Sequence, residues 1–353
     1  MHIKNISWIS FIIIIISSCS RSAPHISLGC EENKVGNSII RWEVTPQLDG
    51  YVRVYAGNTP NDIVEDIPVG MANISDQRLV IINNDPTIRQ YYSIVFNNEK
   101  RIKVASRNIN ITNVYNFRDL GGYRVYPLDK GGKWGKVYRT GNLDAIDSCG
   151  IARLQNLKIK TIVDLRPTKE QNVNGLLKDH FNLISIPIFS KDANQLLALI
   201  KQKKINRGEL TTYMKSVYTR LIKDYKEEYK EVFKLLLDEK NYPIVFQCAV
   251  GKEQSGIVSY LLLSALGINQ ETIKLDYLRT NSFIDMSGAS QYATSLSAGG
   301  QEALTALLLA QEEYLDAAIH EIESSYGDVN SFIIEGLGIA NSELEKLRTM
   351  LLE

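Results

Sequence analysis

This chain of 353 residues has little cysteine, little histidine and no excess of charge, and each shortage excludes a class of protein. Forty Lys and Arg residues balance forty Asp and Glu residues, so bulk charge gives no attraction to nucleic acid. The four cysteines lack the CxxC spacing of a zinc site, and they do not form a disulfide framework. The four histidines are too dispersed for a metal cluster. We therefore expect no metal and no other cofactor.

Two uses of the cysteines stay open at this point. A Cys30–Cys149 disulfide is compatible with the sequence. A Cys-His hydrolase that uses His180 or His320 is a further alternative, although nothing in the sequence places either histidine beside a cysteine.

The N-terminus carries a targeting signal rather than part of the fold. Residues 6–16 form an apolar run behind Lys4, too short to span a bilayer and followed by small residues. The run ends Ile16-Ser17-Ser18-Cys19, which resembles a bacterial lipobox. That resemblance implies a signal peptide over 1–18, lipid attachment at Cys19 and a tether over 19–24. We expect a protein of the bacterial cell envelope, lipid-anchored outside the cytoplasm; an ordinary signal peptide that contains a cysteine is the alternative.

Residues 25–111 are predicted to form an all-β domain. Short alternating runs at 38–44, 50–56, 78–82, 91–96 and 101–105 are separated by breaks rich in Asn, Asp, Pro and Gly. Short strands at this spacing, without helical stretches, are typical of a β-sandwich. The positions of Trp42 and of the Tyr91-Tyr92 pair resemble a fibronectin type III or immunoglobulin-like module. We interpret it as a spacer, with a surface interaction module as the alternative.

The most informative segment spans residues 243–256, with the sequence Pro-Ile-Val-Phe-Gln-Cys-Ala-Val-Gly-Lys-Glu-Gln-Ser-Gly. It predicts a buried strand over 244–246, a tight loop and a helix over 257–266. Backbone N–H groups in such a loop converge at the positive end of the helix and bind an anion, most often phosphate. The same groups favour the thiolate of Cys248, which opens the loop, and make it a nucleophile. A buried, inert cysteine is the alternative.

The loop resembles the C-x5-R-[S/T] signature of the cysteine-dependent phosphatases, and more closely the H-C-x-x-G-K-D-R-T-G motif of atypical bacterial tyrosine and lipid phosphatases. Three earlier segments are similar to the same family. Residues 116–123 read N-F-R-D-L-G-G-Y, residues 138–143 read Y-R-T-G-N-L, and residues 161–166 read T-I-V-D-L-R. The resemblance runs from about residue 113 to the C-terminus and implies a phosphatase-like domain over 112–353.

The order of predicted elements in this domain indicates an α/β fold with a mainly parallel sheet flanked by helices. The patterns predict helices over 145–157, 213–236, 269–281 and 304–322, and a closing helical pair over 329–352. A strand is predicted over 182–188, and a Ser-, Ala- and Gly-rich connection over 287–300.

The resemblance implies a mechanism in which the cysteine attacks phosphorus and forms a phosphocysteine that water then hydrolyses. It assigns the nucleophile to Cys248 and stabilisation of the leaving thiolate to Ser255. Asp164 is the candidate general acid, and Glu253 competes for that role. The predicted phosphate-binding residues are Ala249, Val250, Gly251, Lys252, Gln254, Gly256, Arg118 and Arg166.

Two positions depart from the family motif. Gln254 replaces the arginine that would clamp two phosphoryl oxygens, so a charged planar fork is lost. Gln247 replaces the histidine before the cysteine. These changes indicate a weak enzyme, one with rearranged phosphate contacts that recruit Arg118, Arg139 or Arg166, or an inactive pseudophosphatase that binds a phosphorylated or acidic ligand. The expected partners are a phosphorylated protein, a phospholipid or a small phosphate ester, together with the membrane.

Overall fold

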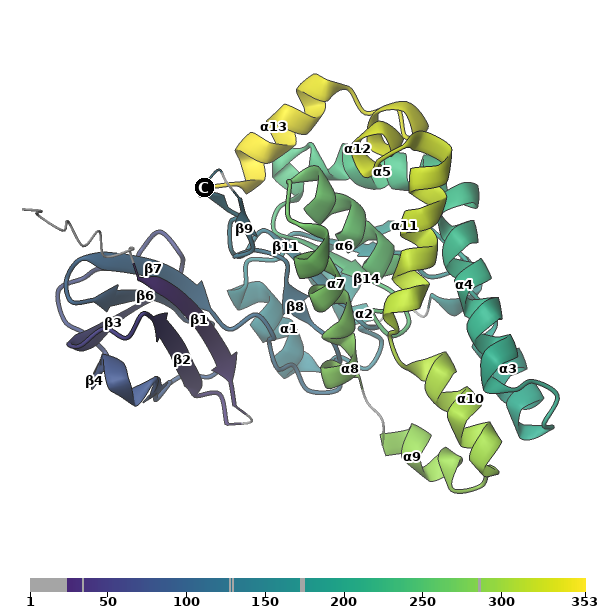
Figure 1. Ribbon diagram of the computed structural model, residues 1–353, viewed down its shortest axis with the longest axis horizontal. Helices are drawn as coiled ribbons and strands as arrows, with labels where there is room; N and C mark the ends of the chain where they lie inside the picture. The colour runs from purple at the N-terminus through teal and green to yellow at the C-terminus, as the bar shows by residue number, and fades with distance from the viewer. Residues whose placement is uncertain (1–23, 34, 127, 129, 172–174, 285–286) are drawn as a thin grey trace, which may run out of the picture.

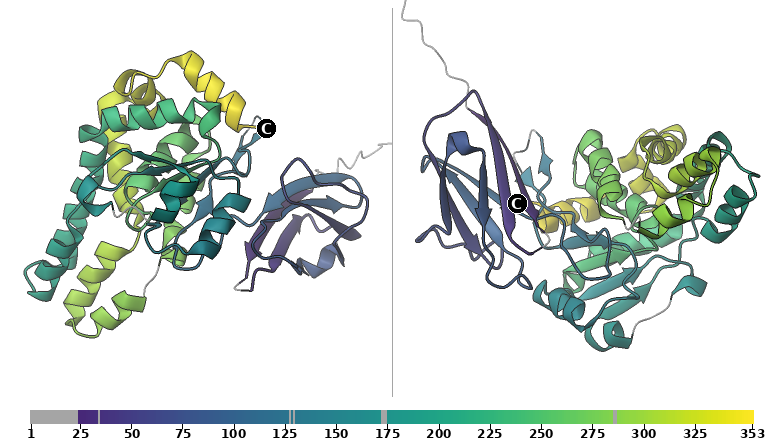
Figure 2. Two further views of the ribbon diagram at one scale, coloured as in Figure 1. Left: turned by 180° about the vertical axis from the view of Figure 1, so that it is seen from behind. Right: turned by 90° about the horizontal axis from the view of Figure 1, so that it is seen from below.

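The computed structural model describes residues 24–353 except 34, 127, 129, 172–174 and 285–286. The predicted signal peptide and the lipidation site at Cys19 therefore lie outside the described residues. Figure 1 shows a β unit at the left and a larger α/β unit at the right, and both views in Figure 2 keep the β unit to one side. None of the described helices is long and apolar enough to cross a membrane.

The N-terminal unit consists of two antiparallel sheets that pack around one core, in the arrangement of a β-sandwich. Trp42 and Ile40 from one sheet meet Val54 and Phe96 from the other, and Trp42 Nε1 donates a hydrogen bond to the carbonyl oxygen of Ile74 at 2.7 Å. One sheet has the order β1-β2-β5 and the other β4-β3-β6-β7. The strands are β1 His25–Glu32, β2 Ser38–Thr45, β3 Tyr51–Gly57, β4 Gly70–Asn73, β5 Arg78–Ile81, β6 Tyr91–Phe96 and β7 Lys100–Ala105.

The sandwich is joined to the α/β unit by buried polar contacts. Arg89, just before β6, donates to Asp119 at 2.6 Å, and both side chains are almost fully buried. Arg153 on α1 (Ser148–Asn156) pairs with Glu32 at the end of β1 at 2.6 Å. Because an ion pair removed from water is costly to break, these contacts resist separation of the two units.

The central sheet of the α/β unit has five strands in the order β13-β12-β14-β11-β8. Four neighbouring strands run parallel and β8 is antiparallel to β11, so the sheet is mixed at one edge. The strands are β8 Arg118–Asp119, β11 Val137–Thr140, β12 Thr161–Asp164, β13 Asn182–Ser185 and β14 Ile244–Gln247; a small hairpin joins β9 Arg124–Val125 to β10 Lys130–Gly131.

Helices cover both faces of this sheet because its strands are apolar on both sides. On β14, Ile244 and Phe246 join the larger core, whereas Val245 joins the smaller core under α1 and α2. Nearly every residue of α6 is buried, so α6 lies inside the larger helical layer (Figure 1). The further helices are α2 Gly175–His180, α3 Ala193–Lys201, α4 Arg207–Asp224, α5 Lys226–Leu236, α6 Gln254–Ala265, α7 Gln270–Leu278, α8 Thr280–Phe283, α9 Ser287–Ala293, α10 Ala298–Leu308, α11 Glu312–Tyr326, α12 Val329–Ser331 and α13 Asn341–Leu351.

Several predicted helices differ from those observed. The connection predicted over 287–300 is largely helical, since it contains α9 and the start of α10. The single helix predicted over 304–322 is broken between Leu308 and Glu312, where Lys252 binds the carbonyl oxygens that end α10. The stripe over 213–236 also belongs to two helices, α4 and α5, which meet at Tyr225. The apolar residues keep a helical spacing across both breaks, so the sequence pattern predicted one continuous helix in each place.

The described cysteines are free thiols. Cys30 lies in the sandwich core, where burial raises its pKa to about 12, and Cys149 is exposed on α1. The Cys30–Cys149 disulfide that the sequence left open is therefore not formed.

Candidate active site

The loop after β14 lies at the carboxyl edge of the parallel strands, where ligands of open α/β sheets usually bind. Cys248 follows β14 directly, is fully buried, and has its Sγ 3.4 Å from the hydroxyl oxygen of Ser255 near the start of α6. The thiol is thus paired with a hydroxyl rather than with a histidine. His180 is exposed and contacts Gln155, and His320 is exposed on α11.

Four consecutive carbonyl groups of the loop are held by side chains from the two preceding motifs. Asn142 donates to the carbonyl of Ala249, from its backbone at 3.2 Å and from its side chain at 3.1 Å. Asn116 donates to Val250 at 3.1 Å and to Gly251 at 2.8 Å. Arg139 donates to Gly251 at 2.7 Å and to Lys252 at 3.4 Å. The two motifs at residues 116–123 and 138–143 therefore supply the side chains that hold the loop.

The N–H group of Cys248 donates to the carbonyl of Thr140, but those of the following loop residues do not donate within the described chain. From Ala249 to Gly256 these groups have no acceptor among the described residues, although residues 251–256 are buried. Buried N–H groups without partners are rare in proteins. The carbonyls are directed to Asn116, Asn142 and Arg139, which leaves these amides available at the N-terminus of α6, where an anion is favoured.

Gly251 is required by this geometry. Its φ of +71° is a conformation that residues with a side chain rarely adopt. A Cβ at this position would also lie 2.6 Å from the Asn116 amide nitrogen and 2.8 Å from the Thr140 backbone. A side chain here would displace the residues that hold the loop.

Two arginines behind the loop share one carboxylate. Arg118 and Arg139 both pair with Asp276 of α7, at 3.1 and 3.2 Å, and all three side chains are buried. Burial and the charge of Arg118 lower the pKa of Arg139 to about 10, even though Asp276 opposes this shift. Arg118 also donates to Asn116. Contrary to the prediction that Arg118 binds phosphate directly, its contacts fix Asn116, which holds the loop.

Lys252 and Glu253 are also directed away from the anion site. Lys252 donates to the carbonyls of Leu307 and Leu308 at 2.7 and 3.0 Å, and burial lowers its pKa to about 8. Glu253 is fully buried, and pairing with Lys191 and Lys252 brings its pKa down to about 2 despite its burial. A carboxyl group with so low a pKa is a poor proton donor, so these contacts oppose the competing role of Glu253 as general acid. Lys252 supplies charge near the loop rather than a direct phosphate contact.

Gln254 does not imitate the missing arginine. Its side-chain amide donates to the carbonyl of Ile188 at 3.0 Å and lies 3.4 Å from the Ser190 hydroxyl. The amide of Gln254 is therefore bound to the segment that follows β13.

Asp164, at the end of β12, lies beside the loop. Its carboxylate accepts a 2.7 Å hydrogen bond from Gln247 and another of 2.7 Å from Arg166. Arg166 also pairs with Asp144 at 2.6 Å. These residues line a cavity of about 380 Å³ that continues past Leu177. Because both carboxylates engage Arg166, its guanidinium is not free to replace the missing loop arginine in this conformation.

Sequence reasoning missed several residues of this arrangement. Asn116 lay within a recognised motif without an assigned role, whereas Asp276 and Lys191 gave no signal, because an isolated acidic or basic residue on a helix or loop has no characteristic pattern. Among the described residues no group of three His, Cys, Asp or Glu side chains is placed to hold a metal ion.

Comparison with known proteins identifies the family of the α/β unit. The model of the tyrosine phosphatase family matches residues 109–353 and leaves the sandwich out. A protein of Cupriavidus necator named as a tyrosine-protein phosphatase is 26% identical over 238 residues, covering 65% of this chain and 84% of that protein. The triple specificity protein phosphatase PtpB of Mycobacterium tuberculosis is 24% identical over 257 residues, covering 62% and 91%. The match to the solved catalytic core of Siw14 covers 50% of this chain and 90% of that chain, at 14% identity and with a TM-score of 0.27.

Proposed function

Because the chain belongs to the tyrosine phosphatase family, we propose that it hydrolyses phosphomonoesters through a phosphocysteine intermediate on Cys248. The strongest support is the loop after Cys248. Its carbonyl groups are held by Asn116, Asn142 and Arg139, and its N–H groups have no acceptor among the described residues. Such amides stabilise the charge that develops on phosphoryl oxygens without any reorganisation during the reaction.

In the first step the Cys248 thiolate attacks phosphorus, the S–P bond forms, and the P–O bond of the ester breaks. The leaving oxygen takes a proton from a general acid, for which Asp164 is the candidate beside the loop. In the second step water attacks phosphorus and gives a proton to the carboxylate that acted as the acid, the S–P bond breaks, and inorganic phosphate leaves. Ser255, 3.4 Å from the sulfur, donates a hydrogen bond to the thiolate that is released.

Net positive charge near the loop partly replaces the arginine lost at position 254. The cations near the loop outnumber the carboxylates by one: Arg118, Arg139, Arg166, Lys191 and Lys252 against Asp144, Asp164, Glu253 and Asp276. In a site removed from water such an excess attracts a phosphoryl dianion. It lacks the bidentate geometry of an arginine in the loop, so we expect slow turnover.

The direct test is hydrolysis of a chromogenic aryl phosphate by the full chain. We expect a measurable rate that Cys248→Ser abolishes, together with trapping of a phosphorylated protein on rapid acid quench of the wild type. Cys149→Ser, at an exposed cysteine, is the matched control and should keep the full rate. Equal rates for wild type and Cys248→Ser would contradict the proposal.

A pseudophosphatase is the second candidate, and the contacts of Gln254 favour it. Its amide is committed to Ile188, so no side chain of the loop is arranged to clamp the transferring phosphoryl group. In that case the amides would bind a phosphorylated or acidic ligand without turnover. Binding of inorganic phosphate to wild type and to Cys248→Ser alike, with no hydrolysis by either, would identify this function.

We also propose that the protein is anchored in the cell envelope by a lipid on Cys19, with the sandwich as a spacer between anchor and site. The lipobox-like Ile16-Ser17-Ser18-Cys19 supports the proposal. Cys19→Ala should move the protein from the membrane fraction to the soluble fraction of cells. Retention of the variant in the membrane fraction would count against the lipid anchor.

A further inference from the structure

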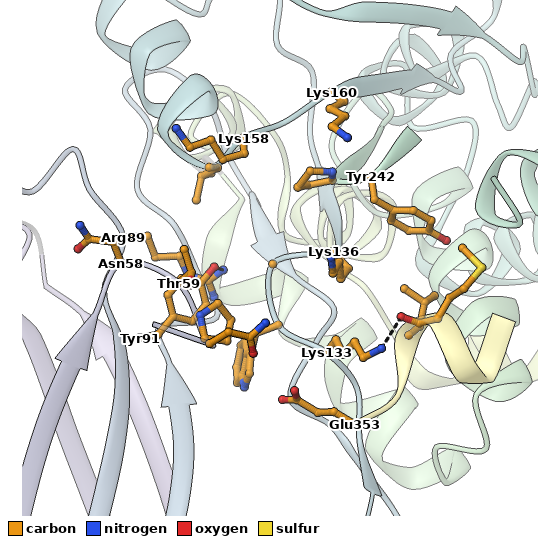
Figure 3. A pocket seen from close by; sticks show the side chains of 18 of the residues that line it. Asn58, Thr59, Arg89, Tyr91, Lys133, Lys136, Lys158, Lys160, Tyr242 and Glu353 are labelled. Carbon is orange, nitrogen blue, oxygen red and sulfur yellow. Dashed lines mark hydrogen bonds between the residues drawn. The ribbon is translucent and has the colours of Figure 1, made fainter. Parts of the chain in front are cut away.

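A cleft of about 860 Å³ opens between the sandwich and the α/β unit, and Figure 3 shows the side chains that line it. Three of the residues that line it come directly before a strand: Lys136 before β11, Lys160 before β12 and Pro243 before β14. These are the amino ends of the parallel strands, whereas Cys248 follows the carboxyl end of β14. The cleft is therefore distinct from the candidate active site.

The lining of the cleft is positively charged. The side chains of Lys136, Lys158 and Lys160 are exposed and make no hydrogen bond or ion pair with the described residues. Lys133 donates to the carbonyl of Met350, shown by the dashed line in Figure 3, and forms no ion pair with the part of the chain that the structure describes. Arg89 is neutralised by Asp119.

The side chains that line the cleft include two carboxylates, those of Glu239 and Glu353, and four lysines, so positive charge is in excess. The whole chain is electrically neutral, so this excess is a local concentration of positive charge. A cleft lined by one sign of charge raises the local concentration of the opposite ion.

The spacing of the lysines matches a ligand with more than one anionic group. Val137, Ile244 and Thr161 are aligned across three adjacent strands, with β14 in the middle. Lys136 and Lys160 precede the two outer members of this row. Two strand spacings of about 4.8 Å separate their backbones by about 10 Å. Lysine side chains from backbones this far apart can contact one molecule together, and a ligand with several anionic groups can engage more of the cleft's lysines at once than a single phosphate does.

The sandwich supplies the facing wall of the cleft. Asn58 and Asn61, from the segment after β3, carry side-chain amides able to donate hydrogen bonds to phosphate oxygens. The volume is within the range of small-molecule sites, about 300–1,000 Å³. A molecule bound here would contact both units at once.

From these observations we infer that the cleft is a second anion site, which binds a soluble small molecule carrying two or more phosphate groups. Lys136, Lys158 and Lys160 supply the charge, and the segment of residues 58–61 closes the site from the sandwich side.

Calorimetric titration of the full chain with inorganic tripolyphosphate tests this inference. We expect the combined variant Lys136→Ala, Lys158→Ala, Lys160→Ala to weaken binding at the cleft by about tenfold or more, because three charge-assisted contacts are lost. The variant in which the same three lysines are replaced by Arg should retain tripolyphosphate binding. A matched control replaces Lys201, Lys203 and Lys204 by Ala; these lysines are also exposed and unpaired among the described residues, and Lys203 shares the positive φ of Lys158.

Aryl phosphate hydrolysis, measured in parallel, separates the two sites. If tripolyphosphate binds only at the Cys248 loop, the cleft variant and the control should bind it with equal affinity and be inhibited equally. That result would overturn the inference. Absence of hydrolysis would leave the calorimetric comparison unaffected. Vesicle binding is measured on chains that also carry Cys19→Ala, so that no lipid anchor contributes. If the otherwise wild-type chain and the control sediment with phosphatidylglycerol vesicles and the cleft variant does not, the cleft binds lipid headgroups, and the soluble ligand is overturned.

Discussion

Arg139 donates a 2.7 Å hydrogen bond from Nη2 to the carbonyl oxygen of Gly251, and its Nη1 pairs with Asp276 at 3.2 Å. This guanidinium is therefore a positioning group for the loop. Arg139 fixes the Gly251 carbonyl, so that this carbonyl does not pair with the neighbouring loop amides. It does not replace the arginine side chain that the family motif has at position 254.

Replacement of Arg139 by Lys tests this role. Lysine keeps the charge beside Asp276 but cannot donate in a planar fork to the loop and to Asp276 together. We expect kcat for aryl phosphate to fall by about 10²-fold, the scale of a small misplacement of catalytic groups, with KM less affected. The melting temperature, measured alongside, should change little; a large drop with kcat per folded molecule unchanged would assign Arg139 a purely structural role.

Restoring the loop arginine should increase the rate. Gln254→Arg introduces a bidentate, charge-assisted clamp, and groups of this kind are worth about 10²–10³-fold in turnover. Gln254→Lys adds charge without the fork and is the matched control, for which we expect a smaller gain. Steady-state kinetics on an aryl phosphate distinguish the two. An unchanged or lower rate in Gln254→Arg would show that another group already occupies the clamping position.

The buried pair of Glu253 and Lys252 should make stability depend on pH. Lys191 and Lys252 hold the folded-state pKa of Glu253 at about 2, below the ordinary 4.5. The ionised carboxylate therefore stabilises the fold fully above about pH 4.5, and this contribution is lost as the pH falls toward 2. The shift corresponds to about 3 kcal/mol in the free energy of unfolding.

Chemical denaturation of Glu253→Gln should show this loss at pH 7 and a smaller difference from wild type near pH 3. The double variant Lys252→Met, Glu253→Gln should recover part of the stability, because it no longer leaves a buried ammonium without its carboxylate. Equal destabilisation of Glu253→Gln at both pH values would contradict the assigned pKa.

Local signals predicted the elements around the loop better than the contacts that hold it. The apolar run before Cys248 and the glycines after it predict strand, loop and helix because those features depend on neighbouring residues. Membership of the tyrosine phosphatase family was likewise predictable from the quoted motifs, and the match to residues 109–353 confirms it. The pairing of Arg118 with Asp276, 158 positions apart, could not be predicted, because it depends on how α7 packs against the sheet.

The same limit applies to Lys252. Its place in the motif predicted a phosphate contact, but its ammonium donates to the carbonyl groups at the end of α10 and pairs with Glu253 at 3.3 Å. No sequence pattern indicated that α10 ends beside the loop. Side-chain chemistry can be read from the motif, whereas side-chain direction depends on tertiary packing.

The role of Asp164 as general acid can be separated from its structural contacts by varying the leaving group. Its carboxylate accepts hydrogen bonds from Gln247 and Arg166, so Asp164→Asn alters those contacts as well as removing the acid. A general acid matters most when the leaving oxygen is strongly basic. We therefore expect Asp164→Asn to slow alkyl phosphate hydrolysis by about 10²–10⁴-fold, and hydrolysis of a nitrophenyl phosphate far less. Asp144→Asn removes the other carboxylate bound to Arg166 and is the matched control. If Asp164→Asn slows both substrates equally, the residue positions Arg166 and Gln247 and the proton comes from elsewhere.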